Sequence, residues 1–390
     1  MILSETQTLE RVLAAVEPLG AEVQSKLLGR VPAQDVFASI PIPAFDNSSM
    51  DGYAVRAADA KVGGELAVIG EQAAGSHGDL VLAPRQAIRI FTGAPIPNGA
   101  DAVIMQEDVE RHGDTIVVRD GVERGENVRI RGGDLCEGQR LASKGEVLTP
   151  ARIAVIGSQG IAELPVYQRP TVAIIATGSE LRPQGKRLGP SEIYETNRIL
   201  LASLTERSNA AADVFDIVPD TEEAHLKTFE TARNRDVMLI AGGMSVGEKD
   251  LVRPILKKLG AHLDLWRVAI KPGKPFLFGR LGRTLVFGLP GNPVSAFVTF
   301  LLFVRPALWK MGGRTDLELF RIPARLASDL SNNGDRPHYF RGVLKEGAFQ
   351  PIGLQQSHAL FALSQANALC RVESGQSLVS GSVVEVVLLE

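Results

Sequence analysis

Thr284-Leu-Val-Phe-Gly-Leu-Pro-Gly-Asn-Pro293 joins an apolar run of strand-forming residues to a loop of glycine and proline. Proline fixes its own φ angle and glycine allows backbone conformations closed to other residues, so the run stops at a defined place. The apolar segment from Val294 to Val304 then has the pattern of a helix. Taken alone, this stretch is an ordinary strand-to-helix turn.

Two further apolar runs end in the same way. Thr171-Val-Ala-Ile-Ile-Ala-Thr177 leads into Gly178-Ser-Glu180, and Asp236-Val-Met-Leu-Ile-Ala241 leads into Gly242-Gly-Met-Ser-Val-Gly-Glu-Lys-Asp250. Strand patterns near 171, 213, 236 and 284 alternate with helix patterns near 193, 222, 249 and 294, which is typical of a doubly wound, mostly parallel α/β sheet. Ligands of such sheets bind beyond the carboxyl ends of the strands, so we expect the three loops to converge.

The composition is that of a soluble globular protein. The chain has 390 residues, of which 45% are hydrophobic and 22% are charged, enough for two to four domains. A formal net charge of -3 argues against nucleic-acid binding, which needs a concentrated positive field. Any anionic ligand must therefore be held by local groups.

Cysteine content and apolar runs bear on the cellular compartment. Two cysteines far apart in sequence, Cys136 and Cys370, predict neither a disulfide framework nor a thiolate metal site, and so favour the reducing cytoplasm. The amino terminus has no basic start followed by an apolar block, so we expect no secretion signal. The run from Ala296 to Val304 is cut by Arg305-Pro306, well short of the ~20 residues of a membrane span. We expect a buried helix there and no membrane association.

The remaining segments predict a multidomain α/β protein. Residues 8–17 and 150–160 have helical patterns, and three prolines between Val31 and Asn47 indicate an extended arm. Glycine-rich turns separate short β-patterned pieces between Val55 and Arg129, and similar pieces follow Gly313. The predicted parts are a discontinuous arm domain (1–53 and 130–168), a β-rich insert (54–129), the doubly wound α/β domain (169–313) and a C-terminal β-domain (314–390).

Two segments of the α/β domain suit an anion. The loop with Gly242, Gly243, Ser245 and Gly247 can present amide donors and a hydroxyl at the positive end of the following helix, although its spacing is neither that of a P-loop nor of a dinucleotide fingerprint. Lys271-Pro-Gly-Lys274-Pro holds two ammonium groups on a segment stiffened by proline. Each could be a plain surface turn, but two such elements at one sheet edge favour a phosphate site.

Acidic residues punctuate several turns: Asp51, Asp134, Glu180 and Asp250. Aspartate is common in turns, and Asp250, in the first turn of a helix expected to start near Glu248, could merely interact with the helix dipole. If these carboxylates do meet the lysines, they would repel an anion unless a divalent cation lay between them. Oxygen ligands beside phosphates suit Mg²⁺.

Other chemistry has little support. The six histidines show no zinc-ligand spacing, and no serine lies in a nucleophile-elbow context. His338-Tyr-Phe-Arg341 reads as a strand whose rings could stack on a ligand, although core packing is the plainer interpretation.

These loops, in this order, resemble the MoeA family of molybdopterin molybdenumtransferases, which includes the E-domain of gephyrin. The resemblance covers nearly the whole chain. Its blocks are FDNSSMDGYAV, IFTGAPIPNGADAVIMQED, NVRIRGGD, TGSEL, GGMSVGEKD, AIKPGKPFLFG and GLPGNPVSAF, followed by QQSHAL and AN.

The resemblance implies an enzyme of molybdenum-cofactor synthesis that inserts molybdenum from molybdate into adenylylated molybdopterin and releases AMP, with Mg²⁺ present. It implies that Asp51, Asp134, Glu180 and Asp250 are catalytic carboxylates around metal and molybdate. The residues that it implies for contacts with the cofactor are Thr92, Gly242, Gly243, Ser245, Gly247, Lys271, Lys274, Pro290, Asn292 and Pro293, the two prolines shaping the pocket.

The family also forms homodimers of four-domain subunits, in which the arm domain serves dimerisation and the site draws loops from both protomers. The resemblance therefore implies that the Asp51 and Asp134 segments face the α/β domain of a partner subunit, and it leaves room for contact with the upstream adenylyltransferase. This chain departs from the family at Ser179, where aspartate is usual, and at Glu195-Thr-Asn197, where Asp-Ser-Asn is usual. Both positions lie outside the four carboxylates.

Two other functions remain open at this stage. A molybdopterin-binding scaffold or sensor would keep the fold without turnover, although binding an anion gains nothing from several carboxylates. A tungstate-selective paralogue would have the same residue types, because the two oxyanions are alike in size and charge. The sequence does not identify downstream acceptors, regulatory partners, the carboxylates that bind metal directly or the role of the β-rich insert.

Overall fold

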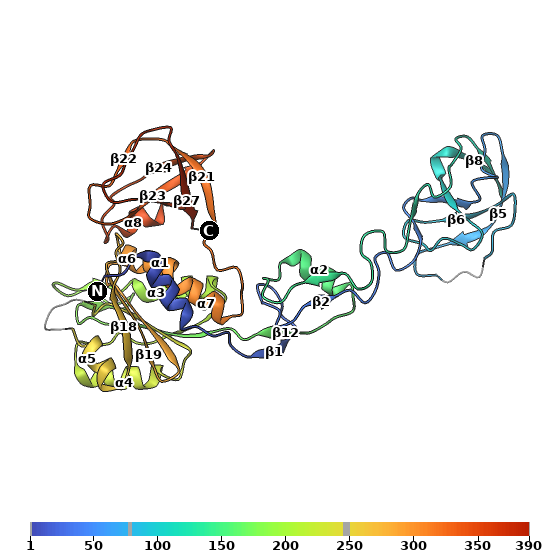
Figure 1. Ribbon diagram of the computed structural model, residues 1–390. Coiled ribbons are helices and arrows are strands. Elements are labelled where there is room, and N and C mark those ends of the chain that lie inside the picture. Colours follow the sequence, from blue (N-terminus) through green and yellow to red (C-terminus); the bar gives the residue numbers. More distant parts are fainter. Residues whose placement is uncertain (1, 77–79, 245–249, 390) are drawn as a thin grey trace. The chain divides into compact units, whose positions relative to one another are not determined.

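The computed structural model describes residues 2–76, 80–244 and 250–389 (Figure 1). The chain divides into two compact units, which we describe separately. Unit 1 comprises Met1–Gln34, Lys144–Thr149 and Glu163–Glu390, and unit 2 comprises Asp35–Ser143 and Pro150–Ala162. The finer division into four domains stays a prediction.

A six-stranded sheet forms the centre of unit 1. Its strand order is β16-β13-β17-β20-β19-β18. The first four are parallel, as the sequence predicts, whereas β19 and β18 are antiparallel to their neighbours. The strand bounds are β13 Thr171–Ala176, β16 Ala211–Val214, β17 Val237–Ala241, β18 His262–Arg267, β19 Pro275–Leu281 and β20 Thr284–Leu289.

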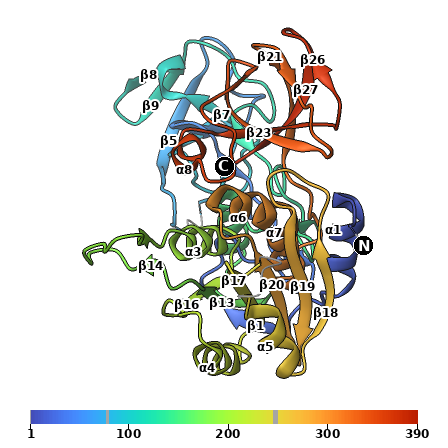
Figure 2. The same cartoon turned by 90° about the vertical axis from the view of Figure 1, so that its left-hand side faces the viewer.

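Helices cover both faces of this sheet, so the doubly wound prediction is confirmed (Figure 2). Alternate residues of a strand point to opposite faces. Val172 and Ile174 therefore join a core with α1, α3, α6 and α7, while Ala173 and Ile175 join one with α4 and α5. The helix bounds are α1 Glu5–Ala14, α3 Asn197–Arg207, α4 Glu222–Ala232, α5 Val252–Lys258, α6 Pro293–Thr299 and α7 Arg305–Met311.

Two predicted helix starts are displaced. The first helix begins at Glu5 rather than residue 8, because Ser4 caps it. The Ser4 hydroxyl accepts a hydrogen bond from the Gln7 backbone amide at 3.2 Å, and the Gln7 side-chain oxygen accepts one from the Ser4 backbone amide. The helix expected near 193 begins at Asn197. Residues 193–194 form instead a short strand, β15 (Ile193–Tyr194), which pairs with β14 (Leu181–Arg182).

The expected end of a helix at Arg305-Pro306 is wrong. A continuous helical segment runs from Pro293 to Met311 through a π-helical turn, η2 (Phe300–Val304). Pro306 directly follows the π turn and lies in the first turn of α7, and the helix continues through it. This 19-residue segment is long and apolar enough to cross a membrane, but 83% of its most apolar 18-residue stretch is buried inside the protein. It is the core helix that the sequence predicts.

The C-terminal part of unit 1 is a closed barrel of five strands, β21-β24-β23-β25-β27. It confirms the predicted terminal β structure. The bounds of its strands are β21 Arg321–Leu326, β23 His338–Lys345, β24 Ala348–Pro351, β25 Ala368–Val372 and β27 Val383–Leu388. The connections between them contain β22 (Leu330–Ser331), β26 (Ser377–Leu378) and α8 (Leu360–Ser364). Outside the barrel, unit 1 also contains β1 (Ala21–Gln24), which pairs with β12 (Leu164–Tyr167).

Unit 2 is built on a second six-stranded sheet, of order β7-β4-β6-β5-β9-β8. The short β-patterned pieces predicted between Val55 and Arg129 include the strands β6, β7 and β9. The bounds are β2 Val36–Phe37, β3 Asn47–Ser48, β4 Gly52–Val55, β5 Glu65–Gln72, β6 Gln86–Ile90, β7 Ala102–Met105, η1 Gln106–Asp108, β8 Val109–His112, β9 Thr115–Val118, β10 Val128–Arg129, β11 Arg140–Ala142 and α2 Pro150–Gly157.

Candidate functional site

The loops after β13, β17 and β20 converge on one cavity of about 860 Å³ in unit 1. These strands are neighbours in the sheet, so their carboxyl ends open at the same edge, as the sequence predicts. Seven residues expected in the site line the cavity: Glu180, Gly242, Gly243, Lys271, Lys274, Pro290 and Asn292. Pro293 is not in its lining and begins α6, immediately after Asn292.

The loop after β17 needs glycine for two reasons. Gly242 and Gly243 have φ angles of 93° and 62°, which L side chains rarely adopt. A Cβ on Gly242 would lie 2.7 Å from the Thr177 carbonyl oxygen, and one on Gly243 would overlap the Val252 side chain. Only glycine lets this backbone pass so close to its neighbours. The expected ligand residues Ser245 and Gly247 lie outside the described residues.

The lysine loop is tied to the barrel by its backbone. The Lys271 amide donates to the Pro337 carbonyl at 2.8 Å, and the Lys271 carbonyl accepts the Tyr339 amide at 2.8 Å. The Lys271 side chain is exposed and Lys274 is half-buried. Because these two bonds hold the amide and the carbonyl of Lys271 in place, less conformational entropy is lost when the ammonium groups bind an anion.

Two helices begin at the cavity. Asn197, the first residue of α3, donates from Nδ2 to the Gly291 carbonyl at 2.7 Å, and Asn292, the N-cap of α6, donates to Ser357 Oγ at 2.9 Å. Asn197 Oδ1 is buried and has no hydrogen-bond partner among the described residues. The partial positive charge of the two helix starts favours a negatively charged ligand.

A buried arginine supports the cavity wall made by residues 355–358. The Arg341 side chain is fully buried and donates to the carbonyls of Leu354 and Gln356, the latter at 3.2 Å. Gln355 returns the contact, accepting the Arg341 amide at 2.9 Å. Burial lowers the pKa of Arg341 below its ordinary value. Arg341 positions the loop, and does not line the cavity.

His338 lies beside the lysine loop and is buried in the strand β23, so core packing is the correct interpretation of this segment. Burial, together with the charges of Lys271, Arg341 and Arg336, lowers its pKa to about 4. The ring is therefore neutral at neutral pH. It adds no charge to a wall that already contains Lys271, Lys274 and Arg336.

Several lining residues were not singled out from the sequence, among them Thr177, Asn197, Ser295, Arg336, Gln356, Ser357 and His358. For the segments 355–358 and 195–197, the sequence offers only the family resemblance. A role for Arg336 has no local signal, because only the packing of barrel against sheet within unit 1 brings it to the cavity.

The acidic residues of unit 1 lie in different surroundings. Glu180 is exposed and lines the cavity, whereas Asp250 is not among the lining residues. Asp250 precedes α5, which begins at Val252 rather than near Glu248, and its Oδ1 accepts the Val252 amide at 3.1 Å. Its other oxygen, Oδ2, is buried with no partner among the described residues. Burial raises the pKa of Asp250 to about 6, against the opposing effect of the amide bonds.

The other predicted carboxylates belong to unit 2. Asp51 Oδ1 accepts both the Thr92 amide and the Thr92 hydroxyl at 2.8 Å, so Thr92 orients this carboxylate. These bonds, with a smaller contribution from Arg89, lower the pKa of Asp51 below its ordinary value. Asp134 is exposed in a turn whose amide donates to the Ile42 carbonyl at 2.9 Å. Within residues 2–76, 80–244 and 250–389, no cluster of three or more acidic, histidine or cysteine residues could hold a metal ion.

Comparisons with known proteins match the whole architecture. Residues 3–160 match the MoeA N-terminal region (domain I and II), residues 173–310 a probable molybdopterin binding domain, and residues 323–389 the MoeA C-terminal region (domain IV). A molybdopterin molybdenumtransferase of Haemophilus influenzae is 37% identical over 359 residues, covering 90% of this chain and 89% of the relative. One from Staphylococcus aureus (strain MRSA252) is 31% identical over 400 residues, covering 100% and 94%. The crystal structure of a molybdopterin biosynthesis moeA protein from Pyrococcus horikoshii OT3 is similar with a TM-score of 0.86, at 32% identity and full coverage of both chains.

Proposed function

Because the chain belongs to the MoeA family of molybdopterin molybdenumtransferases, enzymes of molybdenum-cofactor biosynthesis, we propose that it inserts molybdenum from molybdate into adenylylated molybdopterin and releases AMP. The observation that carries the proposal is the cavity where three strand ends meet Lys271 and Lys274. Adenylylated molybdopterin contains a pyrophosphate, and lysine charges, helix starts and backbone amides together suit such a group.

The residues of the cavity have separable tasks in this proposal. Lys271 and Lys274 bind the phosphates and stabilise charge as the pyrophosphate bond breaks. The helix starts at Asn197 and Asn292 orient the ligand, and the walls restrict the access of water. Glu180 lies at the same cavity and is the one carboxylate among its described lining residues.

The carboxylates fit a role for Mg²⁺. Asp250 has one buried oxygen without a partner among the described residues, and Asp51 has one oxygen already held by Thr92. A cluster of three protein ligands is not required, because Mg²⁺ is commonly held by one or two carboxylates together with phosphates and waters. We propose Asp51, Asp134, Glu180 and Asp250 as its candidate ligands. When bound, Mg²⁺ would supply charge neutralisation at the phosphates.

One assay tests the activity. The purified protein is incubated with adenylylated molybdopterin, Mg²⁺ and either molybdate or tungstate, and AMP is followed by chromatography. We expect molybdate-dependent AMP release by the wild type and none by Asp250→Ala or Glu180→Ala, both folded. Lys257→Ala, which removes an exposed lysine of α5, is the control and should retain full activity. Unchanged AMP release in both carboxylate variants would remove the catalytic assignment.

We further propose a homodimer in which Asp51 and Asp134 of one protomer serve the α/β domain of its partner. Heterodimers of Asp51→Asn and Glu180→Gln subunits, isolated with two affinity tags, test it. If each site takes residues from both subunits, one of the two sites in the heterodimer is intact, and activity should be about half that of the wild type. A heterodimer as inactive as each homodimeric variant would show that each site needs both residues from one chain.

Two alternatives are resolved by the same preparations. A non-catalytic scaffold or sensor would bind molybdopterin but release no AMP with either oxyanion. A tungstate-selective paralogue would turn over faster with tungstate than with molybdate. We also propose a cytoplasmic location and contact with the upstream adenylyltransferase, which co-purification from the cytoplasmic fraction would test.

A further inference from the structure

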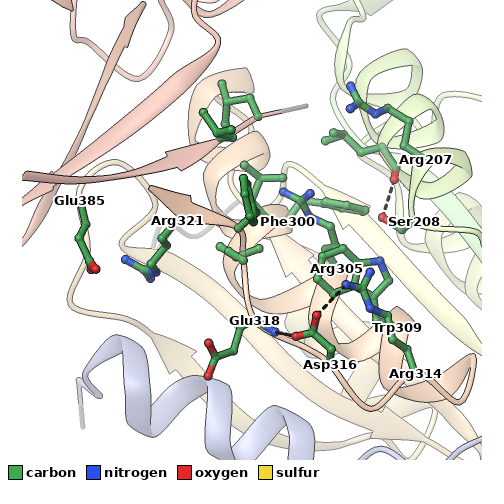
Figure 3. A pocket seen from close by; sticks show the side chains of 16 residues that line it. Arg207, Ser208, Phe300, Arg305, Trp309, Arg314, Asp316, Glu318, Arg321 and Glu385 are labelled. Carbon is green, nitrogen blue, oxygen red and sulfur yellow. Dashed lines mark hydrogen bonds and ion pairs between the residues drawn. The ribbon is translucent and has the colours of Figure 1, made fainter. Parts of the chain in front are cut away.

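A second cavity, of about 750 Å³, lies in unit 1 and is lined by residues from the end of α3, from η2 and from α7 (Figure 3). Asn197, at the start of α3, lines the first cavity, and Arg207, at its end, lines the second. At 1.5 Å per residue, these two positions are roughly 15 Å apart. The second cavity is therefore separate from the site described above.

Four arginines line this second cavity, and three of them, Arg207, Arg305 and Arg314, lie apart from the fourth, Arg321 (Figure 3). Trp309 lies among them, with its ring centre 5.2 Å from the guanidinium carbon of Arg305 and 4.0 Å from that of Arg314. We call Arg207, Arg305 and Arg314 the arginine cluster. All three belong to α3, α7 or the segment directly after α7.

Two members of the arginine cluster, Arg305 and Arg314, are partly buried, whereas Arg207 is exposed. Arg305 Nε and Nη2 and Arg314 Nε are buried and have no hydrogen-bond partner in the described part of the chain. Arg314 has one ion pair, with Asp316 at 3.3 Å, but no described carboxylate lies within 4 Å of Arg207 or Arg305. A buried donor without a partner is costly, and a buried charge more so.

Electrostatics supports this geometry. Burial and the repulsion from Arg207 and Arg314 lower the pKa of Arg305 to about 10. The guanidinium remains charged at neutral pH, so the repulsion persists. Favourable interaction with the end of α3 accounts for Arg207 alone, but not for Arg305, which lies at the start of α7.

The local backbone is also unusual here. The π-helical turn η2 immediately precedes Arg305, and its residues Phe300 and Leu301 line the cavity. Such single π turns are rare and are frequently found at functional sites. Leu204 and Leu319 add to the apolar wall beside the arginine cluster.

We propose that this second cavity binds a phosphate monoester, with its phosphate on the arginine cluster and its organic part against the apolar wall. Guanidinium groups match the oxygens of phosphate in pairs, and a dianion would both satisfy the buried donors and remove the repulsion between the arginines. The volume exceeds what one inorganic anion fills and falls in the range of small-molecule pockets. Asp316, Glu318 and Glu385 also line the cavity, and they restrict the phosphate to the arginine end.

The binding test uses phenyl phosphate and inorganic phosphate as probes in isothermal titration calorimetry. The variants are Arg305→Met, which removes charge and donors, and Arg305→Lys, which keeps the charge but loses the paired donors. Arg283→Met, in the exposed turn before β20, is the matched control. We expect Arg305→Met to weaken phenyl phosphate binding at least about tenfold. The affinity of Arg305→Lys should lie between those of Arg305→Met and the wild type, and the control should bind as tightly as the wild type.

Two further measurements separate the arginine cluster from other roles. Binding should survive in the double variant Lys271→Ala and Lys274→Ala, because those residues belong to the other cavity. Without ligand, Arg305→Met should melt at a temperature no lower than wild type, since it relieves buried repulsion, and it should lose the stabilisation that phenyl phosphate gives the wild type.

Four results would overturn the proposal. They are unchanged phenyl phosphate binding in Arg305→Met, loss of that binding in the double lysine variant, phenyl phosphate no tighter than inorganic phosphate, and a change of oligomeric state in Arg305→Met with no change in binding. The last would assign the arginine cluster to a subunit interface. Because the expected melting temperature of Arg305→Met is not lowered, a misfolded variant would also count against the reasoning, and Arg305→Lys then decides the binding question.

Discussion

Gly243→Ala should destabilise the edge of the sheet where the candidate site lies, for two additive reasons. Gly243 has a φ angle of +62°, and a non-glycine residue with left-handed backbone costs about 1–2 kcal/mol. The new Cβ would also lie 3.1 Å from Thr177 Oγ1 and overlap Val252, which is fully buried and stiff because it is β-branched. Overpacking of this kind costs about 1–3 kcal/mol. The sum is about 2–5 kcal/mol.

Two companion variants separate these terms. Gly260 has a φ angle of +86° and no atom within 4 Å of an added Cβ, so Gly260→Ala carries the backbone cost alone. Val252→Ala removes the atoms that the new Cβ meets, at its own cost of about 1–3 kcal/mol for the buried methyl groups lost. The double variant Gly243→Ala with Val252→Ala should therefore be more stable than the sum of the single changes predicts, by about 1–2 kcal/mol.

The assay must report on this sheet, because a chain of two units need not unfold in one step. Native-state hydrogen exchange of the β17 amides gives the local opening free energy of each variant. Affinity for molybdopterin, measured in parallel, should fall in Gly243→Ala and recover partly in the double variant. If Gly243→Ala costs no more than Gly260→Ala and Val252→Ala gives no rescue, the steric argument for this loop is refuted.

Three further outcomes are expected. Lys271→Ala should weaken molybdopterin binding most at low ionic strength, and a loss of equal size at all salt concentrations would point to structural damage instead. Arg341→Lys should weaken binding without contacting ligand, because the Leu354 and Gln356 carbonyls lose a donor; wild-type affinity in this variant would contradict the positioning role. His338 should titrate near pH 4 by NMR. Because its pKa in the folded protein lies below the ordinary 6.5, the protein should lose at most about 3 kcal/mol of stability as pH falls from 6.5 towards 4. A stability-versus-pH profile that is the same in His338→Gln would disprove this contribution.

The parallel strands and their loops could be predicted because each carries its own signal. An apolar run that stops in glycine or proline marks a strand end whatever lies elsewhere in the chain, and the convergence of the loops then follows from parallel pairing. The antiparallel strands β19 and β18, which end the sheet on one side, have no local signal that distinguishes their direction. Whether a strand lies parallel or antiparallel to its neighbour depends on the connection between them, and here that connection is the lysine loop itself.

The site residues divide along the same line. Lys271, Lys274 and Asn292 lie in loops with recognisable composition, and they do line the cavity. Arg336 comes from the barrel and reaches the cavity by tertiary packing, which leaves no pattern within its own segment. Asp250 is predictable only in part. Its bond from the Val252 amide agrees with the predicted role at the start of a helix, but the burial of its second oxygen depends on surroundings that the segment does not specify.

The helix from Pro293 to Met311 shows how a local rule can fail with a consequence for function. Proline ordinarily ends a helix, so Arg305-Pro306 predicts a helix end. The flanking segments are nearly all buried against the sheet, so ending the helix there would expose a large apolar surface, and the π turn at 300–304 keeps the helix continuous instead. One extra residue in a turn rotates every later side chain by about 100° around the axis. The same irregularity that accommodates Pro306 thus sets the direction of Arg305, and without it this guanidinium would turn away from the cavity that Arg207 and Arg314 also line.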